Sequence, residues 1–263
     1  MKLATRKRLQ LTDTPTVLTP KELGGLKVVR PDSLPPFVNF LVYGEPGVGK
    51  TCLAASASQV EAMHPVLLLD VEGGTLSLRK LYPDVDIVRI KSFLDFVEVH
   101  KALRQPDSPY RTVILDSLTE IQKLGMYEIM RKTVEKDEDR DPDLPGIGEW
   151  GKNIEQTRKI VRAFRNLPAH VIVTGLVMTE KQKNGKTLHK PSLSGKLSGE
   201  VAGFFDIVVY MYLKDRTEAE GGGTTRNIMT QGTENYVAKD RTDNLPTVMV
   251  DTNMQEIHAI INN

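Results

Sequence analysis

The chain has 263 residues, 40% of them hydrophobic, which suits a single α/β domain with one sizeable core and peripheral additions. Its 35 basic and 34 acidic side chains nearly cancel, so any binding to nucleic acid must come from local basic patches and not from a global field. One cysteine excludes an internal disulfide, and no apolar run is long enough for a membrane span or a signal core; together these features predict a cytoplasmic protein that works without a membrane.

Residues 1–36 predict an N-terminal arm, because the segment is polar, rich in proline and has only short apolar pieces. Its cations leave three roles open: a solvated tail, a contact with nucleic acid, or packing on a neighbouring subunit. These cations are Lys2, Arg6, Lys7 and Arg8. We place the domain boundary here and expect one domain over residues 37–263.

A phosphate-binding pattern follows the apolar run at residues 37–43. Residues 44–51 read Gly-Glu-Pro-Gly-Val-Gly-Lys-Thr and fit G-x-x-x-x-G-K-[ST]. Glycines let successive N–H groups turn toward a polyphosphate; Lys50 is predicted to reach the β- and γ-phosphates, and Thr51 to place its hydroxyl on Mg²⁺. Cys52 is expected to be a packed side chain and not a reactive thiol. The predicted nucleotide-binding residues are Gly44, Glu45, Pro46, Gly47, Val48, Gly49, Lys50, Thr51 and Cys52.

Two carboxylates follow the next predicted strand, the apolar run at residues 66–69. Asp70 and Glu72 are two positions apart, so continued alternation would point both side chains the same way, at the carboxyl end where α/β sheets bind ligands. Glu72 is the candidate general base. The alternative is a solvated acidic turn before Gly73 and Gly74.

An aspartate also ends the strand predicted at residues 112–117. Asp116 matches the second nucleotide motif, in which a carboxylate holds Mg²⁺ through water. Between the two acidic strand ends, a strand at residues 86–90 leads to a helix in which His100 is expected to be a surface residue and not a ligand.

A segment rich in lysine, serine and glycine covers residues 179–199, after a fifth strand at residues 170–176. Four of its lysines are candidates to contact the backbone of a nucleic acid: Lys181, Lys183, Lys186 and Lys190. The alternative is a solvated basic loop. No tyrosine, phenylalanine or tryptophan is interleaved, so base stacking from within the segment is not predicted.

The C-terminal part predicts a strand at residues 204–212, a hairpin with strands at 226–230 and 235–239, and a closing helix at 254–261. Lys239 and Arg241 lie at the end of this hairpin and project to the same side. We expect neither cation to have a partner within the chain.

The motifs resemble those of the RecA-like recombination ATPases, most closely the phage-encoded members associated with single-strand DNA annealing. The similar stretches are residues 67–74 (Leu-Leu-Leu-Asp-Val-Glu-Gly-Gly), Trp150-Gly151 before a helix, and residues 193–197 before Phe205-Asp206. The likeness covers roughly residues 37–250. It implies an α/β fold, a RecA-like P-loop NTPase core whose mostly parallel central sheet is flanked by helices and carries a C-terminal β-hairpin.

The resemblance also implies roles for individual residues, with ATP and Mg²⁺ as cofactors. Lys50 and Thr51 correspond to the family's phosphate and magnesium residues, Glu72 to its catalytic base and Asp116 to its magnesium-orienting carboxylate. Lys239 and Arg241 correspond to catalytic cations that reach a neighbouring subunit's nucleotide, which implies a homo-oligomer with nucleotide at its interfaces. In one departure, Leu176 stands where the family carries a glutamine or histidine that senses the γ-phosphate, unless Thr174 or Thr179 replaces it.

The predicted function is therefore a DNA-stimulated ATPase that assembles on single-stranded DNA during recombination or annealing, with a single-strand binding protein as a further partner. Two alternatives stay open: an ATP-gated single-strand clamp with little hydrolysis, and a P-loop ATPase that remodels proteins. A GTPase is disfavoured because the chain has no Asn-Lys-x-Asp motif, and a small-molecule kinase because no arginine-rich lid follows the second motif.

Overall fold

The computed structural model describes residues 22–30, 33 and 36–262. The chain divides into two compact units, Met1–Pro36 and Phe37–Asn263. In the first unit, β1 (Glu22–Leu23) and β2 (Leu26–Lys27) pair antiparallel across Gly24 and Gly25, whose positive φ angles of 59° and 79° permit the tight turn. The basic residues of the predicted arm, Lys2 to Arg8, lie outside the described residues.

The second unit is built on a ten-stranded sheet with the order β12-β10-β9-β3-β7-β6-β4-β5, in which β11 pairs with β9 and β8 with β7. Six strands run parallel: β3 (Asn39–Gly44), β4 (Val66–Asp70), β5 (Val85–Arg89), β6 (Thr112–Asp116), β7 (His170–Lys181) and β9 (Ile207–Asp215). Four pair antiparallel: β8 (Thr187–Pro191), β10 (Thr224–Met229), β11 (Lys239–Asp240) and β12 (Val248–Val250). The predicted α/β fold with a mostly parallel central sheet is confirmed.

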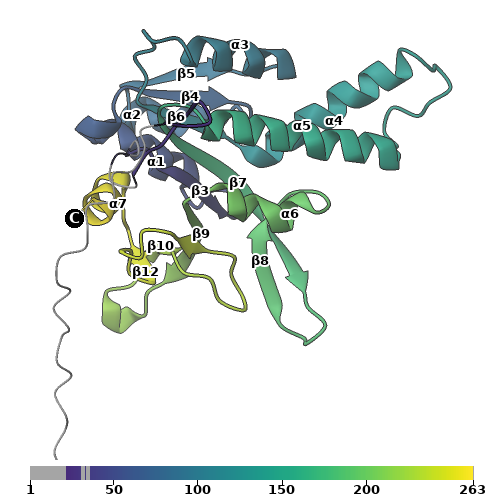
Figure 1. Ribbon diagram of the computed structural model, residues 1–263. Coiled ribbons are helices and arrows are strands. Elements are labelled where there is room, and N and C mark those ends of the chain that lie inside the picture. The colour runs from purple at the N-terminus through teal and green to yellow at the C-terminus, as the bar shows by residue number, and fades with distance from the viewer. Residues whose placement is uncertain (1–21, 31–32, 34–35, 263) are drawn as a thin grey trace, which may run out of the picture. The chain divides into compact units, whose positions relative to one another are not determined.

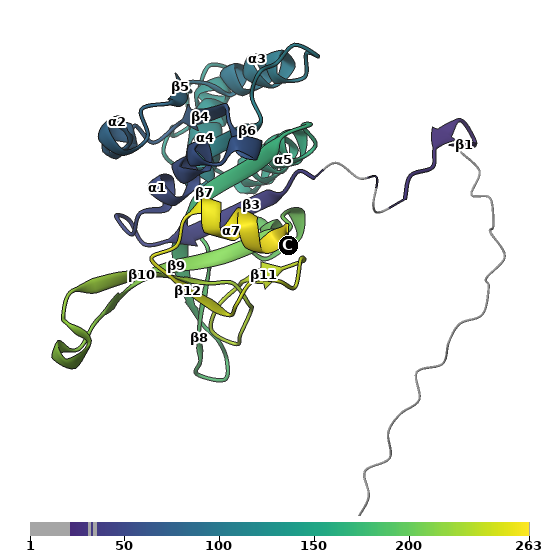
Figure 2. The same cartoon turned by 90° about the vertical axis from the view of Figure 1, so that its left-hand side faces the viewer.

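Helices cover both faces of this sheet, as the nearly continuous apolar strands require. The helices are α1 (Lys50–Ala55), α2 (Leu78–Leu81), α3 (Phe93–Leu103), α4 (Leu118–Val134), α5 (Ile147–Arg165), α6 (Leu197–Glu200) and α7 (Met254–Ile261). Side chains alternate along β3, so Leu41 and Tyr43 pack in one core with α3, α4 and α5, while Phe40 and Val42 pack in the other with α1 and α7. The arrangement of these helices around the sheet is seen in Figure 1 and Figure 2. Among the described residues, none of the helices combines the length and the apolar character that a membrane span needs.

Two expectations about the strands are wrong. The predicted hairpin between residues 226–230 and 235–239 does not form, because the chain already reverses at Gly221–Gly223, where all three φ angles are positive, and β10 therefore pairs with β9. The other edge of β10 takes β12, and Lys239 belongs to β11, which pairs with β9. The segment after the fifth strand is not a loop at its start: β7 continues to Lys181 and turns back as β8, forming a hairpin that extends away from the sheet (Figure 1, Figure 2).

Candidate nucleotide-binding site

The loop from Gly44 to Gly49 connects the carboxyl end of β3 to the first turn of α1. Gly47 and Gly49 have φ angles of 79° and 102°, a region that favours glycine. A Cβ on Gly44 would lie 2.2 Å from the carbonyl oxygen of Met211, so the loop also requires glycine where it passes β9. Val48 is buried and anchors the middle of the loop in the core. The backbone therefore has the glycine-dependent shape that surrounds a polyphosphate.

Lys50 lies folded across its own loop. Its Nζ donates to the carbonyl oxygens of Gly44 (3.1 Å) and Glu45 (2.8 Å). Burial lowers the pKa of this ammonium group, and the negative charges of Glu72 and Asp116 oppose that shift. The side chain is thus a largely desolvated cation at the loop, where a phosphate would be a stronger partner than two neutral carbonyls.

Asp116 connects three elements at the carboxyl edge of the sheet. Its Oδ2 accepts a hydrogen bond of 2.9 Å from the Thr51 hydroxyl, and its Oδ1 accepts one from the Thr174 hydroxyl. Burial raises the pKa of this carboxyl; the two hydroxyl bonds lower it, and the nearby charges of Glu72 and Asp70 raise it. A cation bound here would relieve this concentration of negative charge.

The oxygen atoms of Thr51 and Asp116 fit Mg²⁺, which is usually held by one or two protein oxygens together with waters and substrate phosphates. In the part of the chain that the structure describes, no three histidine, cysteine, aspartate or glutamate side chains converge as a metal cage. A magnesium ion at this site would therefore depend on the phosphates of a nucleotide for most of its ligands.

The side chains of Asp70 and Glu72 lie in different environments, although their spacing predicts the same direction for both. β4 ends at Asp70, which is buried and accepts hydrogen bonds from the backbone N–H of Gly73 (2.6 Å) and the hydroxyl of Thr75 (3.4 Å). Asp70 therefore holds the turn. Glu72 lies in this turn with an exposed side chain, and its charge acts on both Lys50 and Asp116. Both carboxylates therefore lie near the same site, but Asp70 stabilises the turn, whereas Glu72 is free to act on a ligand.

Lys239 and Arg241 both have partners within the chain, contrary to expectation. Lys239 donates to the carbonyl oxygen of Ala202 (2.6 Å), and Arg241 pairs with Asp206 (2.9 Å) and donates to the carbonyl oxygen of Gly203 (3.3 Å). β11 pairs with the first residues of β9, which adjoin the beginning of β3, while the phosphate loop follows its end. These cations therefore lie toward the amino ends of the parallel strands, whereas their own chain's phosphate loop lies at the carboxyl ends.

The four candidate DNA-binding lysines lie on the hairpin of β7 and β8. Lys186 forms an ion pair with Glu234, and Lys190 forms one with Glu180. Lys181 and Lys183 are exposed, and no ion pair engages either of them within the described ranges. The hairpin thus presents two uncompensated cations and two that are already neutralised.

Four tyrosine rings that the sequence motifs do not reveal lie beside this hairpin and its His189. Tyr210 stacks on Tyr212, Tyr236 and His189, with ring centroids 5.6, 5.0 and 5.3 Å apart. Tyr43 adjoins them, and its hydroxyl donates to the backbone carbonyls of His189 and Val237. The spacing of Tyr210 and Tyr212 along one strand was the available signal, whereas Tyr236 is brought in only by tertiary structure.

Arg226 is a further residue near the site that the sequence motifs do not reveal. It lies on β10, far along the chain from the phosphate loop, yet its Nε is 3.0 Å from the position that a Cβ on Gly49 would take. Its backbone is held by Asp251 in two hydrogen bonds, and its charge also reaches Tyr82. Within the described residues, its guanidinium group forms no ion pair. Residues 37–263 therefore offer a cation against the phosphate loop from within the same chain.

Comparison with known proteins gives a family and three distant structural likenesses. A family model described as an AAA domain matches residues 37–242. No curated protein sequence matches. Among solved structures, the chain resembles the flagellar accessory protein FlaH from Methanocaldococcus jannaschii at 10% identity and a TM-score of 0.44, covering 81% of this chain and 84% of that one.

Two further structures show the same level of likeness. The RadB recombinase is similar at 18% identity and a TM-score of 0.39, over 73% of this chain and 79% of that one. The ATPase EscN from the type III secretion system of enteropathogenic E. coli is similar at 14% identity and a TM-score of 0.39, over 66% of this chain and 43% of that one.

Proposed function

Because the chain belongs to the AAA domain family over residues 37–242, we propose that it is an ATPase of the RecA-like type and uses Mg·ATP to assemble on single-stranded DNA in recombination or strand annealing. The proposal includes a homo-oligomer with nucleotide between copies, as in the phage-encoded annealing group that its motifs resemble. A single-strand binding protein would be a further partner.

One observation carries the DNA part of this proposal: a single strand joins the nucleotide site to the basic hairpin. β7 places Thr174 against Asp116 and then runs on, without a break, to Lys181. A change in the charge around Asp116 can therefore reach the hairpin through a rigid element. The ring of His189 on the hairpin and the rings of Tyr212 and Tyr236 beside it are partly exposed and offer a surface on which bases can stack. Proteins that bind single strands commonly combine such rings with basic side chains.

The chemical part of the proposal assigns a role to each group at the site. The Thr51 hydroxyl and the Asp116 carboxylate would hold Mg²⁺, which supplies charge neutralisation for the phosphates when bound. Lys50 would exchange its two carbonyl partners for phosphate oxygens. The exposed carboxylate of Glu72 would orient and deprotonate the attacking water. Lys239 and Arg241 would act on the nucleotide of a neighbouring copy, since they are remote from their own.

The direct experiment measures ATP hydrolysis with and without single-stranded DNA, and DNA affinity with ATP, ADP or no nucleotide. We expect DNA to raise turnover and ATP to raise DNA affinity, because the two sites share β7. Stimulation by double-stranded DNA alone, or no effect of any DNA on turnover, would contradict the DNA assignment while leaving the ATPase assignment in place.

A second candidate, the ATP-gated clamp, is favoured by Leu176. In the sheet register Leu176 lies opposite Gly44, level with the start of the phosphate loop, and its side chain offers no hydrogen-bonding group to a γ-phosphate. Thr179, the other proposed substitute, lies on the hairpin beside His189 and away from Asp116. DNA affinity that depends on ATP while turnover stays near zero with DNA present would favour the clamp.

A further inference from the structure

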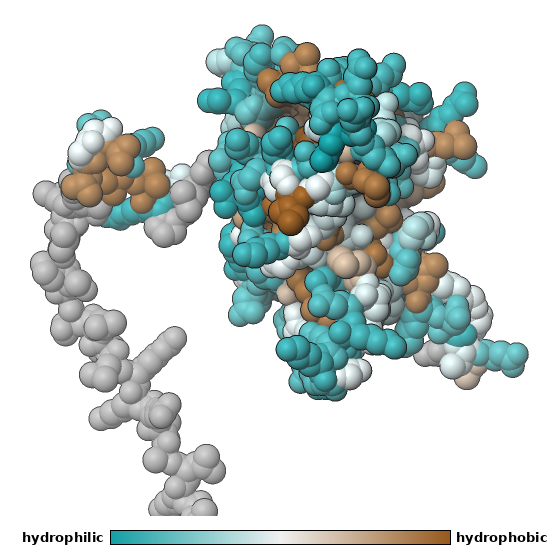
Figure 3. All heavy atoms as spheres, turned by 90° about the vertical axis from the view of Figure 1, so that its right-hand side faces the viewer, coloured by the Kyte–Doolittle hydropathy of each residue, from teal (hydrophilic) through white to brown (hydrophobic). Residues whose placement is uncertain are grey.

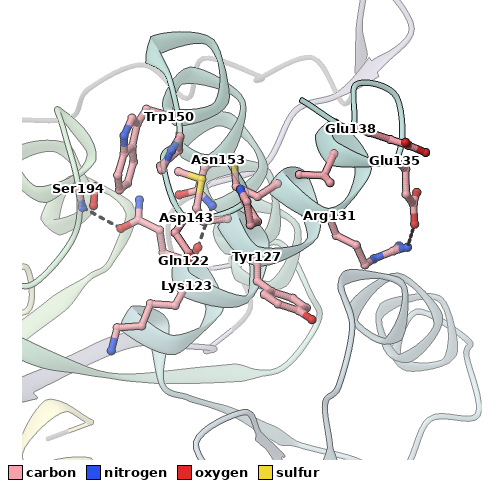
Figure 4. Close-up of a pocket in the computed structure, with 15 residues that line it drawn as sticks. Gln122, Lys123, Tyr127, Arg131, Glu135, Glu138, Asp143, Trp150, Asn153 and Ser194 are labelled. Carbon is pink, nitrogen blue, oxygen red and sulfur yellow. Dashed lines mark hydrogen bonds and ion pairs between the residues drawn. The ribbon is translucent and has the colours of Figure 1, made fainter. Parts of the chain in front are cut away.

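A cavity of about 780 Å³ lies between the outer ends of α4 and α5 and the segment that connects them (Figure 4). Its wall is mostly apolar and includes Met126, Met130, Val134 and Trp150. It shares none of its lining residues with the phosphate loop, and is therefore separate from the nucleotide site of its own chain.

The cavity is incomplete in two respects. Gln122 and Asn153 contribute to its lining, and within the described chain the Gln122 Nε2 and Asn153 Oδ1 atoms are buried without a hydrogen-bond partner. Large apolar side chains also stand exposed around it: Ile147 is 93% exposed, and Leu144 and Tyr127 are each 69% exposed. Apolar exposure of this extent, with tyrosine and tryptophan in it, is typical of a protein interface. The face of the molecule toward which α4 and α5 project is seen in Figure 3.

Charge restricts what can occupy this surface. The connecting segment at residues 135–143 has six acidic and two basic side chains. Glu138 and Asp143 line the cavity, and Arg131 is already paired with Glu135. The phosphates of a nucleic acid would be repelled, whereas a protein segment that combines apolar and basic side chains would be attracted.

The chain itself offers such a segment on the other side of the ATPase unit. Around α2, Leu76 is 83% exposed and Leu81 56% exposed, and the cations Arg79 and Lys80 stand exposed between them. Leu78 is buried and fixes this projection to the core. α2 and the outer ends of α4 and α5 lie on opposite sides in Figure 1, so one copy can present both surfaces to different neighbours at once.

We propose that the cavity between α4 and α5 receives the α2 segment, residues 76–81, of a second copy of this chain. Leu76 and Leu81 enter the apolar cavity, while Arg79 and Lys80 face the acidic segment at residues 135–143. Because the two surfaces differ and face apart, the contact is head-to-tail and builds a ring or an open filament. The inference specifies the assembly that the proposed function requires, and does not depend on DNA.

This contact would connect assembly to hydrolysis. The α2 segment follows the turn that carries Glu72, and Thr75, at the junction, is hydrogen-bonded to Asp70. Holding α2 in a neighbour's cavity would therefore restrict the position of the proposed base. A projection of four side chains covers much less than the roughly 1,600 Å² of a stable interface, so we expect weak assembly that nucleotide strengthens.

The test is a charge exchange measured by sedimentation of the full chain with a non-hydrolysable ATP analogue and no DNA. Arg79→Glu with Lys80→Glu should weaken association at least about tenfold, because like charges then meet across the contact. Glu138→Lys with Asp143→Lys should weaken it similarly, and the two pairs combined in one chain should restore it. All four side chains are exposed, so the fold should survive. The matched control is Lys101→Glu with Arg104→Glu on α3, which makes the same charge change and should leave association unaltered.

Assembly of the Arg79→Glu, Lys80→Glu variant at the wild-type affinity would overturn the proposal and indicate a different protein in the cavity. Failure of the combined variant to recover would overturn it as well. A second measurement fixes the geometry: with Cys52→Ser, the pair Leu81→Cys and Tyr127→Cys should give disulfide-linked dimers and longer ladders on mild oxidation. Absence of cross-links under conditions where the chain sediments as an oligomer would place the contact elsewhere. Because no DNA is present, these outcomes are separate from those that test the proposed function.

Discussion

At the scale of single residues, the environments of Lys50 and Glu72 predict that their variants lose different steps, ATP binding in one case and hydrolysis in the other. Lys50 is desolvated at the loop, so Lys50→Ala should lose affinity for ATP itself. Glu72→Gln keeps the size of an exposed side chain and removes its basicity, so nucleotide should still bind while hydrolysis falls by roughly 10² or more. Nucleotide affinity and turnover are measured separately for each variant. Glu61→Gln, another exposed carboxylate on the same unit, is the control and should hydrolyse normally. Wild-type turnover by Glu72→Gln would remove Glu72 as the base.

Arg226 gives a second prediction at this scale. Its Nε lies against Gly49 and no carboxylate neutralises it among the described residues, so we expect it to contact the bound nucleotide. Charge-assisted hydrogen bonds contribute about 1.5–3 kcal/mol, so Arg226→Gln should raise the KM for ATP roughly 10-fold or more, with a smaller change in kcat. Arg226→Lys should recover part of the loss. Lys214→Gln, an exposed cation on the adjacent strand, serves as the control. An unchanged KM in Arg226→Gln would contradict the contact.

At the scale of elements, the hairpin of β7 and β8 predicts unequal contributions from its lysines. Lys183 is exposed and forms no ion pair with any described residue, so Lys183→Ala should flatten the slope of log affinity for single-stranded DNA against log salt concentration by about 0.7. Lys186 must first leave Glu234, so Lys186→Ala should change the slope less. Lys159→Ala, an exposed lysine on α5, should change nothing. Equal slopes for the wild type and a variant lacking all four hairpin lysines would place the DNA site elsewhere, and the cations of residues 1–36 would be tested next.

The hairpin also shows where prediction from the sequence ends. The parallel strands were predictable because each is a short apolar run between turn signals, and the groups near the phosphate loop were predictable because their motifs are contiguous. Strand pairing was not, since the partner of β10 depends on which edge of β9 is free in the folded sheet. Arg226 and the ring of Tyr236 reach their sites only through such long-range pairing. Asp70 and Glu72 do not share the direction that strand alternation predicts, because β4 ends at Asp70 and Glu72 lies in the turn that follows.

At the scale of the whole molecule, Arg241 lies far from its own phosphate loop, so a catalytic role for it requires assembly. Arg241 is held by Asp206 at the amino edge of the sheet, so it can act on a nucleotide only from a neighbouring copy, after exchanging Asp206 for phosphate. Arg241→Ala should therefore bind ATP nearly normally and hydrolyse it slowly, since a cation supplied by a neighbour can contribute about 10³-fold to turnover. Asp206→Asn frees the same guanidinium and should not reduce turnover in this way.

Mixing two inactive variants tests whether these residues meet across one interface. In mixtures of Arg241→Ala with Glu72→Gln, some interfaces combine an intact Glu72 from one copy with an intact Arg241 from the next, so part of the activity should return. With random mixing in equal amounts, about one interface in four is fully intact, which sets the maximum recovery near a quarter of the wild-type rate. Mixing either variant with more of itself gives no intact interface and is the control. If co-assembly is confirmed by sedimentation and every ratio stays inactive, Glu72 and Arg241 do not act from opposite sides of a shared site, and the nucleotide must be completed by other groups, with Arg226 of the same chain the first to examine.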